Sequence, residues 1–197
     1  MTAPGEGILI VLTGPSGVGK DTVLRELFAL DPTLAYCVSY TTRPPRPGEI
    51  DGVSYWFVDE PTFRAMIDRD EFFEWSIVYG ELKGRTFESV HRAVESGQDT
   101  VIKIDVQGAE KIRGRLGETT TYVFLLPPSI EALEQRLADR ATEDPASLRT
   151  RRELAVSELA LKDTYDHQVV NDDAARAARE ILVIIEAGRA ARRGLPS

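Results

Sequence analysis

The chain has 197 residues, of which 42% are hydrophobic and 28% charged, and its formal net charge at pH 7 is −8. This length suits one globular domain, and the acidic balance argues against nucleic acid or anionic membranes as partners, because either would favour a basic face. The single cysteine, Cys37, excludes an internal disulfide and indicates a small core residue of a reducing compartment. No apolar run reaches the length of a bilayer span and no signal peptide is visible, so a cytoplasmic location is expected.

The first predicted unit is a strand over 8–13, a glycine-rich turn and a helix over 20–29. The turn reads Gly14, Pro15, Ser16, Gly17, Val18, Gly19 and Lys20, and Asp21 and Thr22 follow it. Its glycines let successive backbone N–H groups surround a phosphate, and the positive end of the helix dipole faces the same anion. Residues 14–20 therefore predict a phosphate-binding loop, in which the lysine adds a charge for the outer phosphates. A glycine-rich turn without a ligand is the alternative.

The next segments predict short strands around a proline-rich loop. Residues 34–40 are β-prone, after which three prolines and a glycine between 44 and 48 exclude regular structure and leave an ordered loop. We expect a strand over 53–58, a helix that starts at Pro61, a β-prone segment over 71–79 and a helix over 87–95.

The second half alternates strands and helices. Strands are predicted over 100–105, 122–126 and 169–171, and helices over 107–115, from Ser129, over about 147–162, and from Asp172 or Asp173 to about 192. This alternation predicts an α/β fold, a mainly parallel sheet flanked by helices, with phosphate chemistry at the carboxyl ends of its strands.

Four segments together resemble the guanylate kinases over nearly the whole chain. They are the phosphate-binding loop, residues 39–49 (SYTTRPPRPGE), Phe73-Glu74-Trp75, and residues 104–108 (IDVQG); residues 126–129 (LPPS) and 170–173 (VNDD) agree as well. The resemblance implies a bacterial-type, P-loop nucleoside monophosphate kinase that transfers the γ-phosphoryl group of ATP to GMP in purine nucleotide metabolism, with Mg²⁺ as cofactor. It also implies one domain with a core (about 1–39, 98–134 and 165–197), a GMP-binding region (about 40–97) and a helical lid (about 135–164).

On the ATP side, the resemblance implies that residues 14–22 and Asn171 bind the nucleotide. It implies that the catalytic cations are Lys20, Arg136, Arg140 and Arg151, the last three delivered by a closing lid that excludes water. Phosphoryl transfer needs such cations and positioning rather than a covalent residue. Surface pairing of the arginines with neighbouring acids is the alternative, and Asn171 could instead be a turn or capping residue.

On the GMP side, the resemblance implies that Arg43, Arg46 and Tyr55 bind the phosphate. A guanidinium can bind two oxygens at once, and the prolines order the loop beforehand. Glu74 resembles the guanine reader, because a carboxylate matches the N1–H and N2 donors of guanine, and Ser39 and Asp105 match positions that contact the nucleoside. A solvated charged loop and a surface carboxylate are the alternatives.

Several positions depart from the family's usual residues. Asp21 replaces a small or hydroxyl residue, so Thr22 is the nearest hydroxyl for Mg²⁺, directly or through water; we expect the Asp21 carboxylate to point away from ATP or to face the metal. Lys83 and Arg85 replace a Tyr and a Ser or Thr that touch GMP; Lys83 could hold the phosphate, and Arg85 could donate to guanine O6 or N7. Lys103 stands where an acid is common.

The added basic residues keep a second hypothesis open, in which a related kinase acts on a more anionic acceptor such as ribose bisphosphate. A third hypothesis is a non-catalytic binding module, which the presence of Lys20 disfavours. The predicted partners are ATP and GMP, and both a monomer and a homodimer remain possible.

Overall fold

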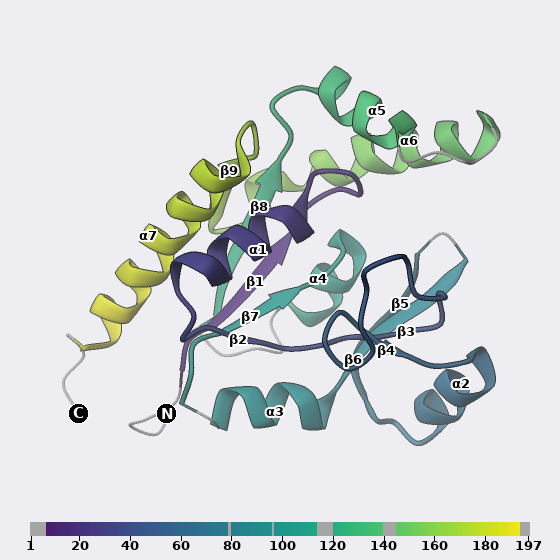
Figure 1. The fold of residues 1–197 in the computed structure, drawn as a ribbon, viewed down its shortest axis with the longest axis horizontal. Coiled ribbons are helices and arrows are strands. Elements are labelled where there is room, and N and C mark those ends of the chain that lie inside the picture. The colour runs from purple at the N-terminus through teal and green to yellow at the C-terminus, as the bar shows by residue number, and fades with distance from the viewer. Residues whose placement is uncertain (1–6, 79, 96, 114–119, 140–144, 194–197) are drawn as a thin grey trace.

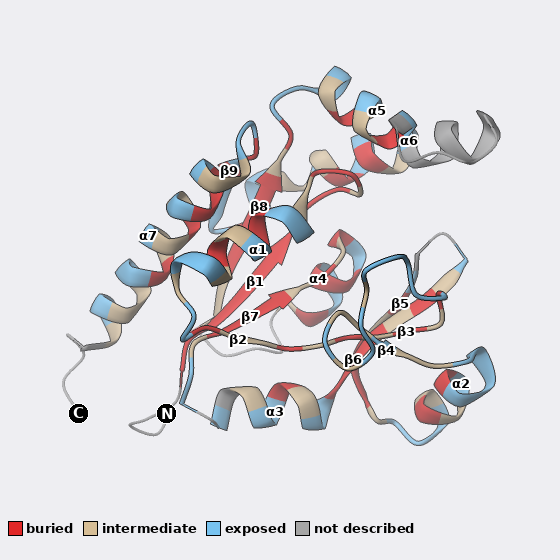
Figure 2. Ribbon diagram, viewed as in Figure 1, coloured by how far each residue is buried: buried red, intermediate tan, exposed pale blue. Residues whose placement is uncertain are grey.

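A computed structural model describes residues 7–78, 80–95, 97–113, 120–139 and 145–193 (Figure 1). Five parallel strands form the main sheet in the order β2 (Ala35–Tyr36), β7 (Thr100–Lys103), β1 (Leu9–Thr13), β8 (Thr120–Leu126) and β9 (His167–Val170). The central strand β1 is wholly buried, as its uninterrupted apolar run predicts (Figure 2). The predicted α/β fold with a mainly parallel sheet is confirmed.

Helices cover both faces of this sheet. α1 (Lys20–Leu30) and α7 (Ala174–Arg193) pack on the face that Ile10 and Leu12 present, whereas α4 (Val106–Ile112) packs on the face of Leu9 and Val11. Because β1 alternates its side chains between the two faces, its five residues contribute to both halves of the core.

A second, four-stranded sheet lies beside the first and falls within residues 40–97 (Figure 1). Its order is β4 (Trp56–Phe57), β3 (Tyr40–Thr41), β6 (Glu81–Thr86) and β5 (Phe72–Val78), with β6 antiparallel to both of its neighbours. α2 (Glu60–Asp68) packs on this sheet through Phe63 and Met66, and α3 (Phe87–Glu95) follows β6.

The remaining helices lie at the phosphate-binding loop. α5 (Ile130–Asp139) and α6 (Pro145–Leu159) supply Leu133, Leu137 and Ala155 to the cluster that buries Val18, and the short helix η1 (Lys162–Thr164) leads to β9. Within the described ranges, no helix is both long and apolar enough to cross a membrane.

Several predicted boundaries differ from the structure. The strand expected over 53–58 is reduced to Trp56–Phe57 because the chain turns at Gly52, whose φ is 74°. The segment 34–40 divides between β2 and β3, which belong to different sheets. The strand expected to reach residue 105 ends at Lys103, because Asp105 becomes the N-cap of α4 and its side chain accepts from the Gly108 N–H.

Candidate active site

The phosphate-binding loop has the backbone that its glycines predict. Gly14, Gly17 and Gly19 have φ values of 140°, 83° and 98°, a region that side-chain-bearing residues rarely adopt. A Cβ at Gly14 would lie 2.4 Å from the Leu125 carbonyl oxygen. Gly19 is the N-cap of α1 and has no side chain to occupy the N–H groups of the first helical turn, so these remain for an anion.

Lys20 folds back over this loop. Its ammonium donates to the carbonyl oxygens of Gly14 (2.5 Å) and Pro15 (3.1 Å). Desolvation lowers the pKa of Lys20 to about 8, although the carboxylates of Glu158 and Asp21 oppose that shift. The lysine therefore remains largely protonated at neutral pH.

Glu158 on α6 is a residue that the sequence interpretation missed. Its side chain is buried, with the residue 7% exposed, and one carboxylate oxygen, Oε2, has no hydrogen-bond partner in the described part of the chain. Burial raises the pKa of Glu158 to about 7, while Lys20 and a backbone hydrogen bond from Ser16 oppose the rise. The signal available in the sequence was an acid on the same face of α6 as the buried Ala155 and the packed Leu159.

Asn171 and Arg136 bind the backbone of the phosphate-binding loop from outside it. The Asn171 side-chain amide donates to the Val18 carbonyl (2.7 Å), and Arg136 donates to the same carbonyl and to that of Asn171, both at 3.2 Å. Both residues therefore contact the predicted ATP site through the protein backbone. Arg140 lies outside the described residues, and Arg151 belongs to α6 but its side chain is not described.

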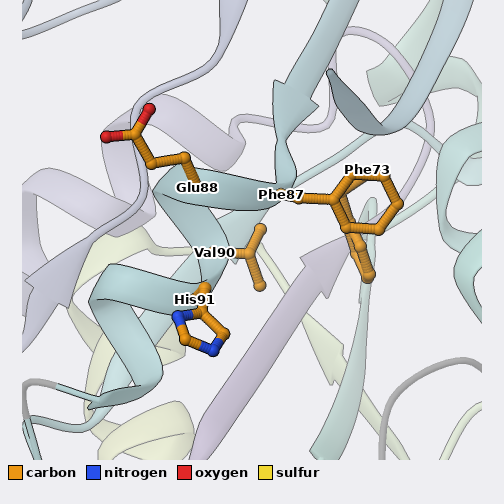
Figure 3. A pocket seen from close by; sticks show the side chains of 5 residues that line it. All are labelled: Phe73, Phe87, Glu88, Val90 and His91. Carbon is orange, nitrogen blue, oxygen red and sulfur yellow. The ribbon is translucent and has the colours of Figure 1, made fainter. Parts of the chain in front are cut away.

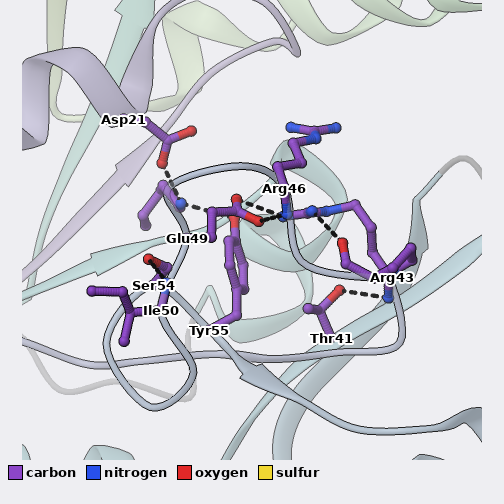
Figure 4. A network of polar contacts seen from close by, with 10 residues as sticks. Asp21, Thr41, Arg43, Arg46, Glu49, Ile50, Ser54 and Tyr55 are labelled. Carbon is purple, nitrogen blue, oxygen red and sulfur yellow. Dashed lines mark hydrogen bonds and ion pairs between the residues drawn. The ribbon is translucent and has the colours of Figure 1, made fainter.

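The loop over residues 43–49 is held together by Glu49 (Figure 4). Arg43 is buried and donates to the Pro44 carbonyl (2.6 Å) and to Glu49 Oε1 (2.7 Å), while the backbone N–H of Arg46 donates to Glu49 Oε2 (2.7 Å). The Arg43 guanidinium also lies 5.4 Å from the ring centroid of Tyr55. The structure thus brings together the three residues predicted to bind the GMP phosphate, with Arg46 exposed at the surface.

A second group of predicted residues lies on one face of the smaller sheet, which we call the acceptor face. Glu74 pairs with Arg85, and Ser76 with Lys83, across β5 and β6, so the four side chains point to the same side. Ser76 donates to Asp105 Oδ2 (2.8 Å), which links this face to the first turn of α4. The buried Ser39 lies two residues before Thr41, which pairs with Lys83.

Arg85 is placed differently from the expected direct contact with guanine. It is 1% exposed and donates from Nη1 to Glu74 Oε1 (2.9 Å), from Nε to the Cys37 carbonyl (3.2 Å) and from Nη2 to the Lys103 carbonyl. All three guanidinium nitrogens therefore bind protein groups, and donation to O6 or N7 of guanine does not follow from this geometry. Burial raises the pKa of Glu74 to about 7, and Arg85 limits that rise.

Two of the unusual residues, Asp21 and Lys103, form an ion pair. Lys103 Nζ donates to Asp21 Oδ1 (2.5 Å) and to the Tyr55 hydroxyl (2.9 Å). The Asp21 carboxylate therefore turns toward β7, and Thr22 lies exposed beside it in the first turn of α1. Over the described residues, no group of three or more His, Cys, Asp or Glu side chains is arranged to hold a metal ion.

An apolar pocket of about 470 Å³ lies elsewhere, between β5 and α3 (Figure 3). Phe73, Phe87, Glu88, Val90 and His91 line it, and the two phenylalanine rings meet edge to face with centroids 5.7 Å apart. No residue predicted to bind ATP or GMP lines this pocket, so it is separate from the candidate active site.

A glycine-rich loop follows the central strand of the parallel sheet, and a second group of arginines and carboxylates lies beside it. Together these features are typical of a P-loop kinase. The shikimate kinase of Aquifex aeolicus shares the fold, with a TM-score of 0.51 and 16% identity over 92% of this chain and 98% of that one.

The similarity of this chain to known proteins defines its family. The guanylate kinase family model matches residues 6–188. The chain is 44% identical to a guanylate kinase of Symbiobacterium thermophilum (94% of this chain, 87% of the relative) and 41% identical to one of Carboxydothermus hydrogenoformans (92% and 89%). A crystal structure of guanylate kinase from Anaplasma phagocytophilum superposes with a TM-score of 0.77, at 31% identity over 93% of this chain and 86% of that one. The chain belongs to the guanylate kinase family, so the predicted family and enzyme class, an ATP-dependent nucleoside monophosphate kinase, are confirmed.

Proposed function

We propose that this chain transfers the γ-phosphoryl group of ATP to GMP, with the acceptor face and Asp105 binding the guanine nucleoside. The observation that carries this proposal is the buried carboxylate of Glu74. Arg85 holds its Oε1, and its Oε2 faces α4, where a Cβ at Gly108 would lie only 3.1 Å away. A carboxylate so fixed matches the two adjacent donors of guanine, whereas adenine offers one donor beside an acceptor.

On the donor side, the phosphate-binding loop and Lys20 hold the ATP phosphates. Arg136 and Asn171 both bind the Val18 carbonyl, which supports a role in keeping the loop in its binding conformation. Mg²⁺ bound with ATP would neutralise polyphosphate charge. The exposed Thr22 hydroxyl and the carboxylate of Asp21 are oxygen donors of the kind that Mg²⁺ prefers, and they are the candidates to approach it.

On the acceptor side, Arg43, Arg46 and Tyr55 bind the GMP phosphate, and the partly exposed Lys83 pairs with Thr41, two residues before Arg43. The contact between Arg43 and Glu49 supports this role, because it holds the guanidinium in the loop before substrate arrives. Both substrates are cytoplasmic nucleotides, and the cytoplasm remains the proposed location.

The ion pairs weaken the hypothesis of a more anionic acceptor. Arg85 is paired with Glu74, and the negative charge of Asp21 lies beside Lys103, so two of the three added basic residues have a carboxylate close by, whichever group the Lys103 ammonium contacts. The site is therefore less positive than the sequence alone suggested, which favours GMP over ribose bisphosphate.

A coupled assay of ADP release across GMP, dGMP, AMP, UMP and ribose bisphosphate tests this function. We expect selective turnover of GMP and dGMP, loss of turnover in Lys20→Ala, and reduced discrimination between GMP and AMP in Glu74→Ala. Lys162→Ala, outside the site, and Glu60→Ala, exposed on α2, are the matched controls. Turnover of ribose bisphosphate in preference to GMP would contradict the proposal, as would unchanged discrimination in Glu74→Ala.

A further inference from the structure

Lys103 lies where the two predicted substrate sites meet. It is the last residue of β7 and pairs with Leu12 on β1, two residues before the phosphate-binding loop begins. Its ammonium binds Asp21, which directly follows Lys20, and also the hydroxyl of Tyr55 in the predicted GMP phosphate site. One side chain thus bridges the donor and acceptor sites. Figure 4 labels its two partners, Asp21 and Tyr55.

The surroundings of Lys103 keep it charged. Its side chain is 10% exposed, and its ammonium lies 4.7 Å from the ring centroid of Tyr55. Burial alone would lower the pKa of Lys103, but Tyr36, Tyr55 and Asp21 outweigh that effect and raise it above the ordinary lysine value. A largely desolvated ammonium, paired with a carboxylate, therefore lies between the two sites that the proposed function assigns to phosphates.

Asp21 is suited to hold this cation in the absence of substrates. Its carboxylate is 70% exposed, so solvation offsets part of any loss when the 2.5 Å contact with Lys103 is broken. Lys103, by contrast, is only 10% exposed, so little water can replace the lost contact and its ammonium needs another anionic partner.

We infer that Lys103 is a catalytic cation shared by both substrates, and that Asp21 is its partner only while the site is empty. The inference rests on the proposed function. In the transfer, the bond between the γ-phosphorus and the β–γ bridging oxygen breaks and a bond to an oxygen of the GMP phosphate forms. Lys103 keeps its proton throughout and supplies positive charge to the phosphate oxygens on either side of the migrating group.

The competing explanation is that Lys103 only neutralises Asp21 and ties β7 to α1. The two explanations differ in what happens when Asp21 is also removed. A neutraliser is no longer needed once Asp21 is Asn, whereas a catalytic cation still is.

The experiment is a double-mutant cycle in the full chain, with kcat and KM for ATP and GMP measured alongside the thermal midpoint. We expect Lys103→Met to lower kcat about 100-fold. Lys103→Arg should keep at least about a tenth of the activity of the unmodified chain, because it keeps the charge. In the Asp21→Asn background, Lys103→Met should again lower kcat by more than about tenfold. The double variant carries no unpaired charge at either position, so it remains informative if Lys103→Met alone is too unstable to assay. Lys162→Met is the control for a lysine outside the site.

Recovery of kcat in the double variant to the level of Asp21→Asn would overturn the inference, because Lys103 would then act only by neutralising Asp21. An unchanged kcat in Lys103→Met, with only a lower thermal midpoint, would overturn it too. Absence of GMP turnover by the unmodified chain would instead contradict the proposed function, so the two failures are distinguishable.

Discussion

At the scale of single residues, we expect the ionisation of Glu74 to govern how the acceptor face responds to pH. Burial raises its pKa to about 7, Asp105 adds to the rise and Arg85 opposes it. A protonated carboxyl no longer offers two acceptors to guanine, so we expect the Kd for GMP in the absence of ATP to rise about tenfold between pH 8 and pH 6.

Calorimetric titration with GMP across this pH range checks the prediction. Glu74→Gln should bind GMP weakly at every pH and show a shallower profile, in which the titration of the GMP phosphate remains. A profile in that variant as steep as in the unmodified chain would assign the pH dependence to another group.

We expect Arg85 to act on GMP only through Glu74, since its Nε, Nη1 and Nη2 each bind a protein group. Arg85→Gln removes the cation that lowers the pKa of Glu74, so we expect the pH profile for GMP binding to move to higher pH, with tighter binding recovered at pH 9. We also expect a loss of about 3–5 kcal/mol of stability, because the variant leaves a buried carboxyl group without its charged partner.

The pH profile separates this role from simple destabilisation, because a purely structural loss would weaken binding equally at every pH. Urea denaturation gives the stability, and Arg64→Gln on the exposed face of α2, whose partner Glu60 is also exposed, is the matched control. An unshifted profile would contradict the positioning role.

At the scale of elements, α6 carries an acid to the phosphate-binding loop. Burial raises the pKa of Glu158 to about 7, and the carboxylate lies close enough to Lys20 that each group shifts the pKa of the other. The phosphates of ATP should raise the pKa of Glu158 further, so binding at pH 7 should take up a proton at this carboxylate. We expect the unmodified chain to take up about half a proton more per ATP than Glu158→Gln.

Titrations with ATP in buffers of different ionisation enthalpy measure this difference. Glu153→Gln, an exposed position on the same helix, should behave like the unmodified chain. Equal proton uptake in the unmodified chain and Glu158→Gln would show that this carboxylate does not respond to the nucleotide.

The elements that the sequence predicted best are those whose signal is local. β1 and α1 follow from an apolar run and a helical period, and the loop between them from its glycines. β6 was not expected as a strand, because Glu81–Thr86 is largely polar, contains Gly84 and is stabilised by pairing with β5 and β3. Its strand structure depends on tertiary context rather than on propensity.

The same distinction applies to the candidate site. Motif residues identified which side chains gather there, but not which charges neutralise each other. Asp21 and Lys103 were each recognised as unusual, yet they are 82 positions apart and only the fold shows that they pair. Glu158 carries no motif at all, and its role depends on the packing of α6 against a loop at the other end of the chain.

At the scale of the whole molecule, the two ends of the strands in the parallel sheet have different functions. The phosphate-binding loop and Lys103 lie at the carboxyl ends of the strands. At the amino ends, Arg189 of α7 donates to Asp99 Oδ2 (2.5 Å) and to Asp31 Oδ2 (2.8 Å). Asp99 directly precedes β7, and Asp31 is the C-cap of α1. Asp99 also accepts from the Ile8 N–H, so one cluster joins α7, α1 and the start of the sheet.

Arg189→Met should therefore lower stability without changing catalysis. The Arg189 side chain is only 26% exposed and makes two charged hydrogen bonds, so we expect a loss of about 1–2 kcal/mol in the free energy of unfolding, with both KM values unchanged. A hydrogen bond from Thr33 and the contact with Arg189 lower the pKa of Asp31 below 3.8 against a smaller opposing effect of burial. The stabilisation by Arg189 is therefore complete above pH 3.8, and it is lost as pH falls through the lowered pKa of Asp31, because the protonated carboxyl no longer attracts the arginine.

Urea denaturation of the unmodified chain and of Arg189→Met from pH 7 to pH 3 checks this prediction. The difference in stability between the two proteins should shrink only at the acidic end. A constant difference would mean that Arg189 stabilises the fold by packing rather than by charge.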